Sequence, residues 1–168
     1  YGRKLFLIEN CIYGVDIQPI ATQISKLRFF ISLVVDQRKN KDAFNFGIRA
    51  LPNLETRFVA ANTLIGVEKD QSLFYTDEIK ALEKELHLVR QKIFGLKDKK
   101  AKLKWRKRDE ELRTRMAEVL KEQGLPLSEA EKLAGWDPYD QNASSSFFDP
   151  EWMFDVKEGF DVVIGNPP

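Results

Sequence analysis

Cysteine and histidine are almost absent from this sequence, which has one of each among 168 residues. A single cysteine, Cys11, cannot form an internal disulfide, and Cys11 with His87 cannot supply the ligand set of a structural zinc site. We therefore expect no metal centre, and we take a cytoplasmic location as the default because nothing points to a disulfide-forming compartment.

Long apolar runs are also missing. The longest uncharged and mainly apolar run, residues 29–35, is far shorter than the roughly 20 residues that span a bilayer. Arg3 and Lys4 are not followed by the apolar block and cleavage site of a signal peptide. We therefore expect no membrane partner. Because the chain begins at Tyr1 and stops after Pro168, directly behind an apolar run, we interpret it as a piece of a longer protein.

The sequence carries little net charge, since 27 basic and 26 acidic residues leave +1. This balance gives no overall electrostatic case for a nucleic-acid partner. Hydrophobic residues at 43% and charged residues at 32% argue against a wholly disordered chain. The basic residues are unevenly distributed, because residues 97–108 contain eight Lys or Arg residues that only Asp98 opposes.

The first region, residues 1–74, has the pattern of a parallel strand–helix–strand unit. Residues 11–17 are apolar and β-branched and end in an acid, which predicts a short buried strand. Pro19 suits the first turn of a helix, and apolar residues at helical spacing predict an amphipathic helix over 19–36. Residues 56–61 predict a second strand. A strand, a helix and a strand in this order predict a βαβ unit of a parallel sheet.

The second region, residues 75–135, predicts a helical hairpin. Alternating spacings of three and four form a heptad seam with a polar interruption at Lys100, and its apolar members are Ile79, Leu82, Leu86, Val89, Ile93, Leu96 and Leu103. A second seam, two residues out of register, consists of Leu112, Met116 and Val119. The slip predicts a turn within residues 95–100 between two antiparallel helices. Thr76 is placed to cap the first helix, and residues 128–134 predict a further short helix.

The third region, residues 136–168, combines an aromatic-rich loop with a strand. Residues 136–146 are rich in turn-forming residues, which predicts an extended loop. Residues 147–154 are aromatic, and we expect their rings to pack onto the rest of the domain. Residues 159–165 predict a third buried strand that runs directly into Asn166-Pro167-Pro168.

Two polar residues follow the predicted strands of the first region. Asp16 ends the first strand, and Asn62 follows the second. In doubly wound α/β folds, ligands bind at the carboxyl ends of the strands, where an acid can accept hydrogen bonds from ribose hydroxyls. Each residue also has a purely local alternative. Asp16 can cap the helix that begins near Pro19, and Asn is common in turns.

The three residues at the end of the chain carry the strongest chemical signal. Two consecutive prolines end a strand abruptly and fix the backbone, because each ring restricts φ. The side-chain oxygen of Asn166 and the carbonyl of Pro167 are then two acceptors held close together. By binding both N–H groups of a planar amino group, they would strengthen the nitrogen lone pair for attack. The alternative is a strand followed by a stiff loop.

The run Gly-Phe-Asp-Val-Val-Ile-Gly-Asn-Pro-Pro at residues 159–168 resembles motif IV of S-adenosylmethionine-dependent amino methyltransferases. Residues 13–19 resemble motif II, and residues 51–54 with residues 61–64 resemble motif III. The order and spacing are most similar to type IIG restriction–modification proteins, in which adenine methyltransferase and endonuclease share one chain. The resemblance implies a partial Rossmann-like methyltransferase sheet, doubly wound and mainly parallel, with an inserted antiparallel helical hairpin.

The resemblance also implies a role for each motif residue. Asp16 would bind the ribose of S-adenosylmethionine, Ile17 would pack on its adenine, and Asn62 would contact the adenine edge, where the family often has Asp. The amino group of an adenine flipped out of double-stranded DNA would be bound by Asn166, Pro167 and Pro168. The methyl group would move by direct displacement. Asn at this position favours adenine N6, although RNA and protein-glutamine methyltransferases share the motif class.

The basic segment, residues 97–108, has two interpretations. It contacts DNA phosphates outside the catalytic cleft, through Lys99, Lys100, Lys102, Lys104, Arg106, Lys107 and Arg108. Alternatively, it is a solvated helical turn whose acidic partners are Glu110, Glu111 and Glu118. A different functional class also stays open, in which the hairpin is a coiled-coil-like interaction module. The chain would then self-associate through the hairpin or through exposed sheet edges.

Overall fold

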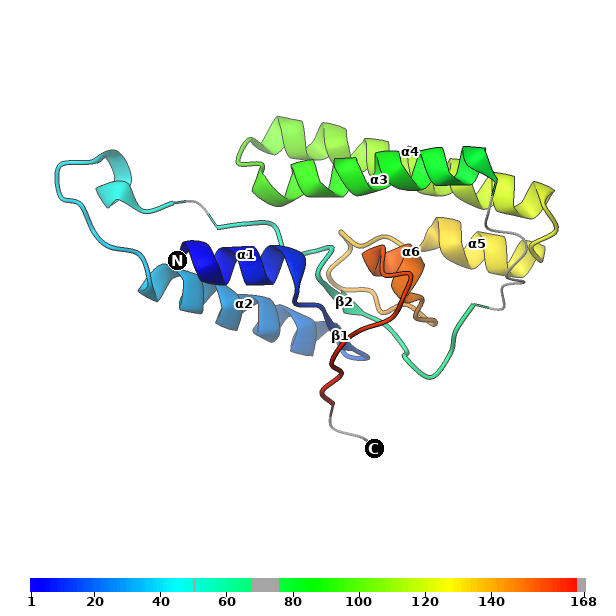
Figure 1. The fold of residues 1–168 in the computed structure, drawn as a ribbon, viewed down its shortest axis with the longest axis horizontal. Helices are drawn as coiled ribbons and strands as arrows, with labels where there is room; N and C mark the ends of the chain where they lie inside the picture. Colours follow the sequence, from blue (N-terminus) through cyan, green and yellow to red (C-terminus); the bar gives the residue numbers. More distant parts are fainter. Residues whose placement is uncertain (50, 68–75, 166–168) are drawn as a thin grey trace.

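The computed structural model describes residues 1–49, 51–67 and 76–165, and within them the chain is mostly helical with a small parallel sheet (Figure 1). The elements are α1 (Gly2–Asn10), β1 (Gly14–Asp16), α2 (Pro19–Val35), the short 3₁₀ turn η1 (Phe44–Gly47), β2 (Phe58–Ala60), α3 (Asp77–Gly95), α4 (Lys99–Glu122), α5 (Leu127–Gly135) and α6 (Pro150–Phe154). Across the described ranges, no helix is both long and apolar enough to cross a membrane.

β1, α2 and β2 form the predicted βαβ unit. The strands run parallel, and their register places Val15 opposite Val59. Pro19 occupies the first turn of α2, where its missing N–H leaves no hydrogen bond unmade. Both strands are shorter than predicted. The first begins only at Gly14, because the N–H groups of Cys11 and Ile12 still donate to the carbonyl of Leu7 at the end of α1, a helix that the sequence pattern did not indicate.

Gly14 lies opposite Phe58 in the parallel pair of strands. A Cβ atom at Gly14 would overlap Cδ1 of Phe58, whose ring is buried and packs on Phe29 of α2. We therefore expect Gly14→Ala to lower the free energy of unfolding of the full-length protein by about 1–3 kcal/mol, as measured by urea denaturation. Gly66→Ala is the matched control because a Cβ there meets nothing within 4 Å. Equal destabilisation by both changes would contradict this account of Gly14.

α3 and α4 pack side by side as the predicted antiparallel hairpin (Figure 1). Thr76 caps α3, because its hydroxyl oxygen accepts a hydrogen bond from the N–H of Ile79. Asp98 caps α4 in the same way, with its carboxylate 2.6 Å from the nitrogen of Ala101. The turn between the helices is residues 96–98, inside the predicted range.

Two apolar clusters hold the sheet and the helices together. The larger one joins the hairpin seam to the sheet and to the aromatic segment, and it includes Val59, Ala61, Ile79, Leu86, Leu112, Met116, Phe147 and Trp152. The smaller one consists of Ile8, Leu33, Leu54, Phe58 and Phe94. The hairpin seam is thus used inside the chain, and this argues against the seam as a surface for a partner.

The aromatic segment, residues 147–154, packs onto the domain as predicted. Phe147, Trp152, Met153 and Phe154 are buried. Residues 150–154 also form α6, a short helix that begins where Asp149 accepts a hydrogen bond from the N–H of Trp152. Five residues are too few to show helical periodicity, although the Asp-Pro pair at its start is a known helix-start signal.

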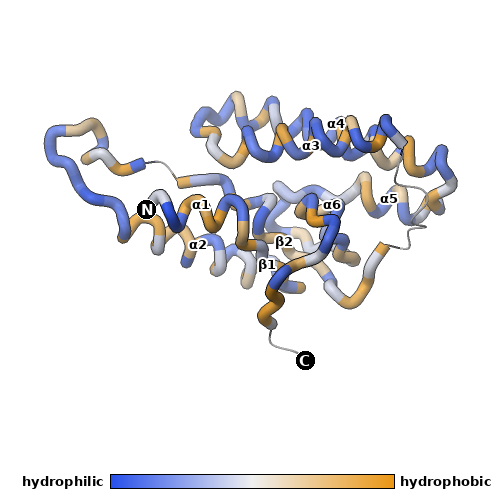
Figure 2. Tube along the Cα trace, in the orientation of Figure 1, coloured by the Kyte–Doolittle hydropathy of each residue, from blue (hydrophilic) through white to orange (hydrophobic). Residues whose placement is uncertain are grey.

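The prediction of a third buried strand over residues 159–165 is wrong for this structure. The segment has no regular structure, and Val162, Val163 and Ile164 are 72%, 79% and 92% exposed. It is the hydrophobic stretch close to the C-terminus in Figure 2. A strand forms only beside a partner, and no described residue pairs with this one. The apolar pattern indicates burial but does not identify what covers the segment. Self-association through such surfaces stays a prediction.

Candidate functional site

The carboxyl ends of β1 and β2 meet at one edge of the sheet. The N–H of Ala61 donates to the carbonyl oxygen of Asp16 at 2.9 Å, which extends the parallel ladder by one bond. Three predicted site residues therefore lie at this edge, since Asp16 ends β1, Ile17 follows it, and Asn62 follows the bridge residue Ala61 that comes after β2.

Asp16 is exposed and retains a carboxylate oxygen for a ligand. Its Oδ1 accepts a hydrogen bond from the N–H of Gln18 at 2.8 Å, a turn bond that leads the chain into α2. Its Oδ2 has no hydrogen-bond partner among the described residues. Ile17 is 59% exposed beside it, and its side chain offers an apolar surface to a ring. The local and the ligand-binding interpretations of Asp16 are therefore compatible.

Asn62 also combines a local bond with a free group. Its Oδ1 accepts a hydrogen bond from the N–H of Leu64 at 3.1 Å, as expected of a turn residue. Its Nδ2 donates to no other described residue. The amide can therefore still donate a hydrogen bond at the edge where Asp16 lies.

A serine-rich loop closes beside this edge. The N–H of Ser145 donates to Ala60, and the carbonyl of Ser145 accepts from the N–H of Asn62, so the loop pairs with the end of β2. The hydroxyl of Ser144 donates to the carbonyl of Ile17 at 2.8 Å. Sequence reasoning predicted only an extended loop here, because a Ser-rich run carries no signal for the strand that it will meet.

A cavity of about 270 Å³ lies between this loop, α2, β2 and the end of α5. Lys26 of α2 lines it and is only 7% exposed. Burial lowers the pKa of the Lys26 ammonium, while the negative charge of Glu55 partly opposes that shift. A buried basic group of α2 therefore lines the same cavity as the serine-rich loop and the end of β2.

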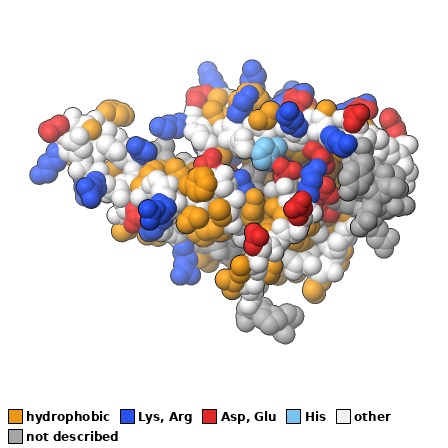
Figure 3. Space-filling view, viewed as in Figure 1, with side chains coloured by type: hydrophobic (Ala, Val, Ile, Leu, Met, Phe, Trp, Pro, Cys, Tyr) orange, Lys and Arg blue, Asp and Glu red, His pale blue; other side chains and the backbone are white. Residues whose placement is uncertain are grey.

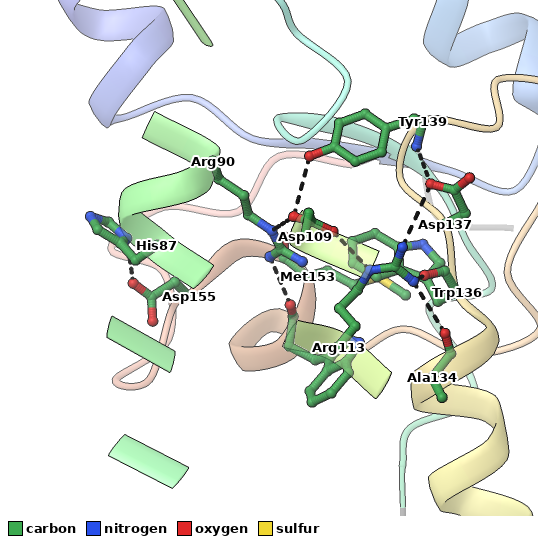
Figure 4. Close-up of polar contacts among 11 residues, drawn as sticks. His87, Arg90, Asp109, Arg113, Ala134, Trp136, Asp137, Tyr139, Met153 and Asp155 are labelled. Carbon is green, nitrogen blue, oxygen red and sulfur yellow. Dashed lines mark hydrogen bonds and ion pairs between the residues drawn. The ribbon is translucent and has the colours of Figure 1, made fainter. Parts of the chain in front are cut away.

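A buried ionic network connects the hairpin to the segments that follow it (Figure 4). Asp109 of α4 is fully buried, with one oxygen 3.0 Å from Nε of Arg90 and the other 2.8 Å from Nε of Arg113. The hydroxyl of Tyr139 donates to the same carboxylate at 3.2 Å. Burial, followed by the nearby charge of Asp109, raises the pKa of Tyr139, so this hydroxyl remains a donor.

Both arginines extend the network to backbone carbonyls. Arg90 donates to the carbonyl of Trp152 at 3.0 Å, and Arg113 donates to those of Ala134 and Trp136. The network thereby fixes α6 and the end of α5 against the hairpin. Sequence reasoning missed it, although Asp109 stands three residues before Leu112 on the second seam, where a charge is unusual.

The structure divides the basic segment. Arg106 pairs with Glu55 at 2.9 Å, and Arg108 pairs with Glu85 at 2.6 Å and with Glu111 at 3.2 Å. Glu111 is thus confirmed as an acidic partner. Glu118 pairs with Arg115, outside the segment, and no described basic side chain pairs with Glu110. The lysines have no ion pair with any described residue, and they are Lys97, Lys99, Lys100, Lys102, Lys104 and Lys107.

Asn166, Pro167 and Pro168 lie outside the described residues, so their role stays a prediction. No group of three or more His, Cys, Asp or Glu side chains is arranged to hold a metal ion within the part of the chain that the structure describes.

Comparison with known proteins identifies the family. The model of the family described as "Eco57I restriction-modification methylase" matches residues 10–168, which is nearly the whole chain. The chain belongs to the Eco57I restriction-modification methylase family. The match includes both strands of the sheet and the whole helical hairpin.

The name of one curated relative contains both a restriction enzyme and a methyltransferase. It is a putative type II restriction enzyme and methyltransferase of Methanocaldococcus jannaschii, 39% identical over 66 residues. The match covers 39% of this chain but only 5% of the relative, so the chain spans a small part of that protein's length. No solved structure matches this member of the Eco57I family.

Proposed function

We propose that this chain is part of a DNA methyltransferase that transfers a methyl group from S-adenosylmethionine to adenine N6 in a type IIG restriction–modification system. The juxtaposition of Asp16 and Asn62 at the carboxyl edge of two parallel strands carries the proposal, together with family membership. The sheet would be the edge of a Rossmann-like, doubly wound fold. The relative's name supports an accompanying endonuclease, and a DNA substrate favours the cytoplasm.

The residues present fit the cofactor. Oδ2 of Asp16 is available to ribose hydroxyls, the exposed side chain of Ile17 to the adenine ring, and Nδ2 of Asn62 to a ring nitrogen. When bound, S-adenosylmethionine supplies the sulfonium methyl group. Asn166 and Pro167 would accept hydrogen bonds from the target amino group and orient its nitrogen, so that positioning supplies most of the acceleration.

Asp16→Ala is expected to weaken S-adenosylmethionine binding by the full-length protein about 10- to 100-fold. A hydrogen bond to a charged group contributes about 1.5–3 kcal/mol, and the substitution removes the carboxylate. Isothermal titration calorimetry measures the change. Asp42→Ala, which removes another exposed carboxylate, is the control and should bind as the wild type does. Unchanged affinity in Asp16→Ala would show that this carboxylate does not hold the ribose.

Methyl transfer by the full-length protein tests the proposed function directly. The protein is incubated with methyl-labelled S-adenosylmethionine and duplex DNA, and the DNA is then hydrolysed to nucleosides. Label in N6-methyladenine is the expected result. Label in a cytosine product would overturn the base assignment. Label found only in RNA or protein glutamine, offered in parallel reactions, would retain the chemistry but replace DNA as the substrate.

A further inference from the structure

A second feature unrelated to the sheet edge is an arm, residues 37–49, that projects at one end of the long axis (Figure 1). The arm has a defined conformation. The side-chain amide of Gln37 bonds both backbone groups of Arg49 and closes the neck. Nearer the tip, the N–H of Asn40 donates to the carbonyl of Phe46 at 2.9 Å. The backbone of the arm is therefore held in place by local hydrogen bonds.

The tip presents aromatic rings to solvent. Phe44 is 98% exposed and Phe46 is 57% exposed. Asn45 and Phe46 both have a left-handed backbone, with φ of 50° and 54°, which is unfavourable for a bulky side chain. Neither ring belongs to the apolar clusters of the described fold. The fold thus keeps Phe46 in an unfavourable backbone conformation, although its ring does not pack in the core. Strained residues of this kind often lie at functional sites.

The same arm carries basic side chains. Arg38, Lys39 and Lys41 are exposed and form no ion pair with any described residue, and Asp42 is the acidic residue next to them. Figure 3 shows Lys and Arg side chains on the arm and over the hairpin. Since the whole chain has a net charge of only +1, this local excess marks the arm as a cationic surface.

The hairpin tip, residues 96–100, lies at the same end of the molecule as the arm (Figure 1). It adds Lys97, Lys99 and Lys100, which also have no ion pair within the described ranges. The 17 residues of α2 separate this end from the carboxyl edge of the sheet, a length of about 25 Å. Contacts here would therefore engage a segment of a long polyanion outside the cofactor site.

We propose that the arm and the hairpin tip form a second DNA-binding surface, in which the lysines and Arg38 contact phosphates and Phe44 enters a base step as an apolar wedge. An exposed ring among unpaired cations matches the combination that architectural proteins use on duplex DNA. DNA as the partner rests on the proposed function. The proposal divides the basic segment by position. Its tip lysines contact phosphate, whereas Arg108 joins the two helices of the hairpin and Arg106 joins the hairpin to the loop before β2.

The experiment measures binding of the full-length protein to a duplex as a function of salt. The triple variant Arg38→Gln, Lys39→Gln, Lys41→Gln should lower the slope of log K against log salt by about 2.7, at roughly 0.9 for each phosphate contact. The matched control replaces three exposed lysines of the helical hairpin by glutamine. These are Lys80, Lys84 and Lys121, which lie at the end of the hairpin opposite its tip. The control should leave the slope unchanged. Equal slopes for the two triple variants would overturn the proposal.

Phe44→Ala tests the wedge separately from charge. It should weaken DNA binding about tenfold and reduce the bend of the duplex, measured by energy transfer between dyes at its ends. Phe6→Ala, which removes a 61% exposed ring from α1, is the control. Unchanged affinity and bend in Phe44→Ala would overturn the wedge. A changed oligomeric state with normal DNA binding would instead assign the arm to protein contacts and overturn the proposal.

The two proposals fail in different ways. If wild type transfers no methyl group to DNA but binds it through the arm, the enzymatic proposal falls and the DNA-binding surface stands. If methyl transfer to N6 is normal and the arm variants bind and bend DNA like wild type, the surface falls and the enzymatic proposal stands. S-adenosylmethionine affinity should be the same in all arm variants, because Asp16 precedes α2 and the arm follows it, so the length of this helix separates them.

Discussion

Asp109→Ala is expected to lower the free energy of unfolding of the full-length protein by about 3–5 kcal/mol, the range for breaking a buried ion pair. Asp109 is fully buried, and the side chains of Arg113 and Arg90 are only 3% and 11% exposed, so removing the carboxylate leaves two largely buried guanidinium groups without it. Arg90 and Arg113 would then be like charges with no carboxylate between them. Urea denaturation, followed by the fluorescence of Trp136 and Trp152 beside the network, measures the change.

Glu110→Ala is the matched control for Asp109→Ala. Glu110 is the next residue of the same helix, but it is exposed, so its removal should change stability by less than about 0.5 kcal/mol. Similar midpoints for the two variants would contradict a stabilising role for the network. Replacing the arginines and the aspartate together by apolar residues of similar volume should cost much less than Asp109→Ala, because no charge is then left unpaired.

The βαβ unit and the hairpin could be predicted because their signals are local and repeated. Pro19 marks the start of a helix whose apolar residues recur over several turns, and Thr76 marks another. The two-residue slip between the seams predicted a turn within residues 95–100, and the structure has it at residues 96–98. Because parallel strands joined by a helix bring their carboxyl ends to one edge, the same pattern also brought Asp16 and Asn62 together.

The remaining features depend on contacts between distant residues. Ser145 pairs with β2 across more than 80 positions of sequence, and Asp109 meets Arg90 and Tyr139 from three different segments. For residues 159–165 the sequence predicted an element that is not observed. The apolar pattern predicted a strand, but the described chain supplies no strand to pair with it. Periodicity indicates which side of an element is apolar, but the partner is decided by tertiary packing.

Asn166→Ala is expected to lower the rate of methyl transfer by the full-length protein about 10²- to 10³-fold, the loss found when one preorganised polar group is removed from a charge-developing site. The alanine removes an acceptor for the target amino group but leaves the rigid Pro167-Pro168 backbone. S-adenosylmethionine affinity should stay at the wild-type value, because that site is assigned to Asp16. Single-turnover transfer to duplex DNA separates the chemical step from binding.

Asn142→Ala is the control for Asn166→Ala, because Asn142 is an exposed asparagine in the loop beside the sheet edge. It should methylate DNA at the wild-type rate. Asn166→Asp, which retains an acceptor oxygen, should recover part of the rate lost in Asn166→Ala. A wild-type rate in Asn166→Ala would show that the Asn-Pro-Pro run is a strand end without chemistry. A loss of cofactor affinity along with the rate would instead mean that Asn166 supports the cofactor site, and the assignment of the amino-group contact would then be wrong.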